Sequence, residues 1–165
     1  MRRFSFLVLL LAAAFPAAAQ QTVGCNSPES KQLDFWVGEW DLTYGDGGKG
    51  TNRITKILDG CAILEEFTGA PGVKLNGRSF SAFDVATRRW KQAWVDDSGA
   101  YLDFTGSRED GRMVFVREAT RGEKKFLQRM VFADVTPQSL LWTWQRSDDG
   151  KEWKTLWEIR YKRVR

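Results

Sequence analysis

The segment RSFSAFDVATRRWKQAWVDDSGAYLDFT, residues 78–105, determines the fold class because it contains three strand-like runs separated by two turns. Apolar and polar residues alternate within each run, and side chains two positions apart lie on the same face of a strand. The runs cover residues 78–85, 90–95 and 101–105. The turns at Thr87-Arg88 and at residues 96–99 are too short to hold a crossover helix. The segment therefore predicts three antiparallel strands joined by hairpins.

The same pattern continues on both sides of this segment. Ten runs in all are separated by turn residues, among which Asp-Gly pairs recur. The runs cover residues 39–44, 51–58, 61–68, 78–85, 90–95, 101–105, 113–118, 126–132, 140–145 and 153–164. Hairpin-linked strands leave long exposed edges in an open sheet, and closure of the sheet removes those edges. The sequence predicts an all-β fold, a closed antiparallel up-and-down barrel of about ten strands with a short N-terminal helix.

The first 19 residues have the features of a secretory signal peptide. Arg2 and Arg3 precede an apolar run over residues 4–15, and Ala17-Ala18-Ala19 supplies an A-x-A cleavage site. The apolar run is shorter than the roughly 20 residues that span a bilayer, and no second run of that length follows. We therefore predict a periplasmic or secreted protein without a membrane span.

The exported part is predicted to divide into an arm and a barrel. Residues 20–32 form the arm with its short helix, for which Ser27-Pro28-Glu29 supplies an N-cap, a proline at N1 and an acid in the first turn. Residues 33–165 form the barrel domain. Cys25 and Cys61 are predicted to form a disulfide, because an even number of cysteines in an exported chain favours pairing. Two separate thiols and lipidation of Cys25 are the alternatives.

Composition excludes several classes of function. The chain contains no histidine, which excludes Ser-His-Asp and Cys-His catalysis and haem held by histidine. A formal net charge of +4, partly due to the signal peptide, argues against a nucleic-acid partner. The sequence shows no metal-ligand cluster and no phosphate-binding glycine loop, so we predict neither a metal nor a cofactor.

Several predicted strands carry polar residues among aromatic ones on one face. In residues 90–95, Gln92 and Trp94 share a face, whereas Arg89 and Lys91 share the opposite one. The charged face belongs in water, so Gln92 and Trp94 are predicted to point inward. The same reasoning predicts a ligand site formed by Glu65, Phe67, Ser79, Gln92, Trp94, Arg129, Trp142 and Trp144. Inside a barrel, Glu65 and Arg129 would need each other or a ligand, because an unpaired buried charge is costly.

Motifs along the chain resemble those of one family. The motifs are LDFWVGEW at residues 33–40, Gly60-Cys61 with Glu65 and Phe67, Gly77-x-Ser79, the WKQAWVD segment at 90–96 and the SDDGKEW segment at 147–153. They are similar to a family of secreted bacterial lipocalin-like (calycin-type) β-barrel proteins, over about residues 33–163. The resemblance implies a calycin barrel and assigns no substrate.

The Gly38-x-Trp40 motif resembles the G-x-W signature of calycin barrels. The resemblance implies that Trp40 packs across the closed end of the barrel. A basic residue of the last strand, Arg160 or Arg163, would then cover the indole through a cation–π contact. We assign Gly38, Trp40 and Arg160 to this structural role.

Three functions agree with the sequence. An exported barrel that binds a small apolar or amphipathic ligand fits the aromatic interior best. The second is a histidine-free enzyme of the isomerase or lyase type, with Glu65 as the base and Arg129 or Gln92 stabilising charge. The third is a structural or interaction module that binds another envelope protein through an exposed edge or its open end.

Overall fold

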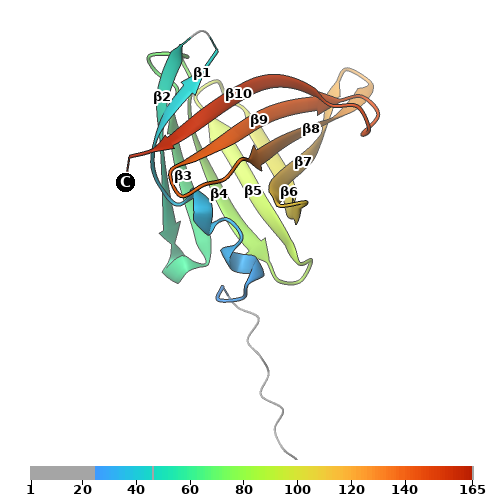
Figure 1. Cartoon of the computed structure of the whole chain (residues 1–165). Coiled ribbons are helices and arrows are strands. Elements are labelled where there is room, and N and C mark those ends of the chain that lie inside the picture. Colours follow the sequence, from blue (N-terminus) through green and yellow to red (C-terminus); the bar gives the residue numbers. More distant parts are fainter. Residues whose placement is uncertain (1–24, 46, 165) are drawn as a thin grey trace, which may run out of the picture.

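The computed structural model describes residues 25–45 and 47–164, and within them ten antiparallel strands close into a barrel (Figure 1). Neighbours in sequence are neighbours in the barrel, and the last strand pairs with the first, so the predicted up-and-down topology is confirmed. The strands are β1 (Gly38–Tyr44), β2 (Gly48–Ile57), β3 (Ala62–Thr68), β4 (Asn76–Asp84), β5 (Arg89–Asp96), β6 (Tyr101–Glu109), β7 (Arg112–Arg121), β8 (Lys124–Ala133), β9 (Ser139–Ser147) and β10 (Lys154–Arg163). The predicted signal peptide lies outside the described residues.

Turn chemistry and one bulge set the register of the strands. Between β6 and β7, Asp110 and Gly111 have φ angles of 47° and 79°, a left-handed backbone that matches the twist of a tight hairpin. In β10 the pairing with β9 shifts between Thr155 and Trp157. The extra residue leaves Leu156 exposed, and from Trp157 onward alternate side chains of β10 point into the barrel.

A pair of 3₁₀ turns closes one end of the barrel. They are η1 (Glu29–Lys31) and η2 (Asp34–Trp36), and they occupy the place of the predicted short helix (Figure 1). Leu33 and Trp36 are fully buried, and the Trp36 ring meets Phe132 edge-on at 5.1 Å between centroids. Burial of these apolar side chains makes the segment a plug, and we refer to this end of the barrel as the closed end.

The Gly38-x-Trp40 motif lies beside the plug. Gly38 has a φ of 140°, which a residue with a side chain rarely adopts, and the chain turns there from η2 into β1. The Trp40 Nε1 donates a hydrogen bond to the carbonyl oxygen of Trp36 at 2.7 Å. Trp40 is therefore buried across the closed end with its one polar atom satisfied.

Arg163, and not Arg160, covers the Trp40 ring. Its guanidinium carbon is 4.0 Å from the ring centroid, and its three nitrogens donate to backbone carbonyls of residues 35, 37 and 137. The assignment of this role to Arg160 was wrong. Tyr161 points inward, so position 163 lies on the same face, whereas Arg160 points outward and pairs with Glu158.

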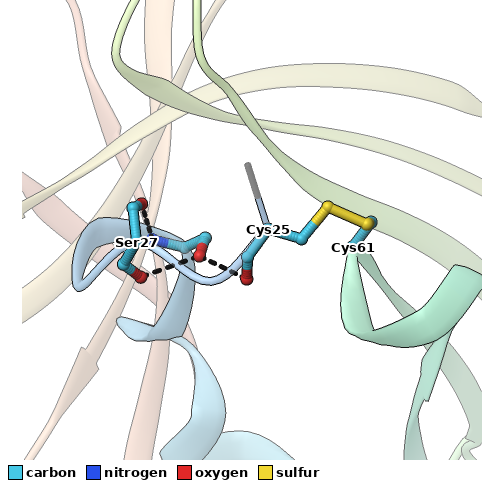
Figure 2. Close-up of a disulfide and its surroundings, with 4 residues drawn as sticks. Cys25, Ser27 and Cys61 are labelled. Atoms are coloured by element: carbon cyan, nitrogen blue, oxygen red, sulfur yellow. Dashed lines mark hydrogen bonds between the residues drawn. A yellow bond between two sulfur atoms is a disulfide. The ribbon is translucent and has the colours of Figure 1, made fainter. Parts of the chain in front are cut away.

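A disulfide joins the N-terminal arm to the closed end, as predicted. Cys25 and Cys61 are bonded with their Cα atoms 4.6 Å apart, and Cys61 follows the 3₁₀ turn η3 (Leu58–Gly60) (Figure 2). The Ser30 hydroxyl donates to the carbonyl oxygen of Cys25 at 2.6 Å and thereby orders the arm. A disulfide fits an oxidising compartment. None of the helices in the described segments is long and apolar enough to cross a membrane.

Candidate functional site

A cavity of about 340 Å³ lies inside the barrel. Trp36 of the plug lines it at the closed end. At the opposite end, the lining includes Leu75 from the β3–β4 connection and Asp96, the last residue of β5. We call this second end the mouth. The cavity therefore extends from the plug to the loops at the mouth.

Aromatic residues make up half of the cavity lining. On β9, Trp142 and Trp144 stack with an interplanar angle of 9° and 6.4 Å between their centroids. Phe67 meets Trp94 edge-on at 5.9 Å. The aromatic residues of the lining are Trp36, Phe67, Trp94, Phe104, Trp142, Trp144, Trp157 and Tyr161. Mutual packing holds these rings in place, so the cavity offers preformed flat apolar surfaces.

Glu65 is a buried acid in this wall. It is 6% exposed, and its two oxygens accept hydrogen bonds from Asn52 Nδ2 at 2.7 Å and from Ser79 Oγ at 2.6 Å. Burial raises the pKa of Glu65 from 4.5 to about 7, because desolvation disfavours the charged form more than these donors and the nearby Arg78 favour it. Near neutral pH the side chain is therefore a mixture of carboxyl and carboxylate.

Asn52 on β2 links Glu65 on β3 to Tyr161 on β10, which is the strand on the far side of β1. The Asn52 Nδ2 donates to Tyr161 Oη at 3.1 Å. Burial and the neighbouring Glu65 carboxylate both raise the pKa of Tyr161, so its phenol stays protonated. The interior thus holds a hydrogen-bonded chain from Ser79 through Glu65 and Asn52 to Tyr161.

Two buried polar atoms near this chain have no hydrogen-bond partner among residues 25–45 and 47–164. They are the Trp36 Nε1 and the Asn52 Oδ1. An unsatisfied buried polar group costs roughly 1–3 kcal/mol, so such groups usually bind water or a ligand. Trp36 also lines the cavity, and its N–H lies near the Tyr161 hydroxyl without forming a well-aligned hydrogen bond to it.

Gln92 adds a second polar group to the wall. Its Nε2 donates to the Ser81 hydroxyl at 2.9 Å, and both side chains are buried. Because Gln92 lies on the same face of β5 as Trp94, the amide stands among aromatic rings. Its carboxamide oxygen is the group that a ligand donor would meet.

The structure brings most of the predicted ligand site together. Ser79 lies behind Glu65, to which it donates its hydroxyl. The predicted residues that line the cavity are Glu65, Phe67, Gln92, Trp94, Trp142 and Trp144. The six lining residues lie on β3, β5 and β9, and Ser79 lies on β4.

Arg129 is not part of this site. It lies on the outer face of β8, where its Nε donates to Gln145 at 2.6 Å and its guanidinium carbon lies 4.0 Å from the centroid of the Trp153 ring. The predicted pair with Glu65 is therefore wrong. Both faces of β8 carry apolar residues, and the neighbouring Met130, which lines the cavity, shows that the predicted face was off by one residue.

Sequence reasoning also missed polar residues that face the interior. Asn52 shares a face of β2 with the buried Ile54, so a polar residue in an apolar position was the available signal. Arg117 likewise shares a face of β7 with Met113 and Phe115. Both residues are placed by strand alternation, and neither belongs to a short motif.

The comparisons with family models and curated proteins assign no function to this chain, so the geometry of the cavity is the main guide to its function. Across the described residues, no group of three or more acidic or cysteine side chains is placed to hold a metal ion. The closed ten-strand barrel is consistent with a lipocalin-like fold. No protein-family model matches this chain, and no curated protein shows significant similarity to it.

Proposed function

We propose that this barrel binds one small molecule with an apolar body and a polar end. The observation that carries the proposal is the cavity of about 340 Å³ with its aromatic wall. Ligand sites are concave, mostly apolar and equipped with a few placed polar groups, and this cavity has that composition. The flat surfaces of Trp142 and Trp144 favour a body that contains a ring or an extended chain.

The unpaired Trp36 N–H supports the same proposal. A buried donor without a hydrogen-bond partner gains a hydrogen bond when a ligand brings an acceptor to it. A wholly hydrocarbon ligand would leave that donor unpaired. The site therefore favours an amphipathic molecule over a purely apolar one.

Membership of the secreted bacterial lipocalin-like family and export to the periplasm or medium belong to the same proposal. The G-x-W arrangement at Trp40, covered by Arg163, supports the family assignment. The Cys25–Cys61 disulfide supports an oxidising location.

Fluorescence titration with N-phenyl-1-naphthylamine, a neutral apolar probe, tests this function. Energy transfer from the tryptophans is expected to saturate at one probe per barrel. Leu102→Trp adds bulk to the cavity lining and is expected to abolish the transfer, whereas Tyr101→Trp, at a residue 65% exposed on the same strand, should leave it intact. Absence of saturable binding to the wild-type protein, or equal binding by both variants, would refute the proposal. If the probe binds as expected, native mass spectrometry of the mature protein would identify a co-purifying natural ligand.

Catalysis by Glu65 is a second candidate function. Its pKa of about 7 suits proton exchange at neutral pH, and the side chain lines a cavity. Binding is favoured because Asn52 and Ser79 already occupy both carboxylate oxygens. Proton-transfer catalysis would incorporate deuterium from D₂O into the co-purified ligand with the wild-type protein and not with Glu65→Gln.

A further inference from the structure

Arg117 faces the interior of the barrel near the mouth. It shares a face of β7 with the buried Met113 and Phe115. Its neighbours are two residues of the cavity wall. The guanidinium carbon lies 5.9 Å from the centroid of the Phe104 ring, and Nη1 donates to Gln128 Oε1 at 2.7 Å. The guanidinium is therefore held beside the cavity by an aromatic ring and a neutral amide.

Arg117 forms no ion pair within the described part of the chain. Among the residues that the structure describes, no carboxylate lies within 4.0 Å of its nitrogens. Its Nε is also buried without a hydrogen-bond partner. Arg146, which pairs with Gln128 across β8 and β9, does have a counter-charge, because its Nη2 donates a hydrogen bond to the Asp148 carboxylate at 2.9 Å. An arginine placed against an apolar wall with a free donor is costly unless an anion completes the site.

The arrangement selects the kind of anion. A guanidinium presents its N–H groups in a planar fork that matches the two oxygens of a carboxylate. A single unpaired arginine balances a single negative charge. The carboxylate of Glu65 disfavours a second anion deeper in the cavity, so a charged end belongs at Arg117 and the apolar body among the tryptophans.

We propose that Arg117 binds the carboxylate of an amphipathic monocarboxylic acid whose apolar body fills the aromatic cavity. This inference rests on the proposed binding function and names the class of ligand. It also assigns Gln128 a positioning role, because its Oε1 holds the guanidinium at the wall.

The test compares decanoate with 1-decanol as competitors of N-phenyl-1-naphthylamine at about pH 7.5, where the acid is ionised. Wild-type protein is expected to bind decanoate about tenfold or more tightly than decanol. This difference in affinity is what charge-assisted hydrogen bonds between a guanidinium and a carboxylate typically contribute. Arg117→Gln should abolish this preference and keep the affinity for the neutral probe. Arg129→Gln is the matched control, because Arg129 also donates to a glutamine but lies on the outer face, and it should keep the preference.

The outcomes separate this inference from the function on which it rests. Failure of the neutral probe to bind wild-type protein would refute the binding function and the inference together. Probe binding with equal displacement by decanoate and decanol, or a preference that survives Arg117→Gln, would refute the inference alone. Should Arg117→Gln fail to bind the probe, Arg117→Lys provides the test. It keeps the charge without the planar fork and should lower the preference for decanoate while the probe still binds.

Discussion

Replacement of Glu65 by glutamine is expected to stabilise the barrel at about pH 8 and to leave it nearly unchanged at about pH 4.5. In the folded protein the pKa of Glu65 is raised from 4.5 to about 7, so the fold favours the protonated carboxyl group. The stabilisation from this group is fully present below about pH 4.5 and is lost as the pH rises through about 7. Glutamine stays neutral at every pH and avoids this loss.

The structure sets the size of the effect. A pKa of about 7 in the fold against 4.5 in the unfolded chain corresponds to about 3 kcal/mol of unfolding free energy. The amide of Glu65→Gln can accept the hydrogen bond from Asn52 and donate one to the Ser79 oxygen, so the interior network is kept. The variant should therefore exceed the wild type by up to about 3 kcal/mol at about pH 8.

Urea denaturation followed by tryptophan fluorescence over about pH 4.5 to 8 measures this difference. Glu66→Gln is the matched control, because Glu66 is the next residue of β3, points outward and lies 3.5 Å from Arg78. The stability gained by Glu65→Gln should grow across this pH range, and that of Glu66→Gln should show no such growth. Parallel stability curves for the wild type and Glu65→Gln would refute the reasoning.

Three further predictions concern the closed end and the cavity wall. Arg163→Met should lower the free energy of unfolding by about 2–4 kcal/mol in thermal denaturation, because it removes hydrogen bonds to backbone carbonyls and a cation–π contact. The same change at Arg160, an exposed arginine of β10, should cost under about 0.5 kcal/mol. Reduction of the Cys25–Cys61 disulfide, 36 residues apart, should cost about 4 kcal/mol, and identical urea midpoints with and without reductant would contradict this. Gly77→Ala should cost about 1–3 kcal/mol and shift the tryptophan emission, because the added Cβ would overlap the Trp94 ring. An unchanged emission spectrum would show that the ring does not fill this space.

The sequence alone determined the architecture of the barrel. Alternation in runs such as residues 90–95 predicts strands, because successive side chains of a strand point to opposite faces. Short Asp-Gly turns such as Asp110-Gly111 permit only hairpins between those strands. Ten such strands avoid exposed edges by closing, and the structure confirms that closure. The cysteine pair was predictable because only two cysteines were available.

Only the tertiary structure decided which faces and partners form the site. Alternation defines two faces of β8 without stating which one is inside, and Arg129 was misplaced because both faces carry apolar residues. Closure of the barrel also pairs β1 with β10, which brings Asn52 to Tyr161, 109 residues away in the chain. The unpaired donors of Trp36 and Arg117 likewise exist only when the chain is folded, because hydrogen-bond satisfaction is a property of packing and not of residue type.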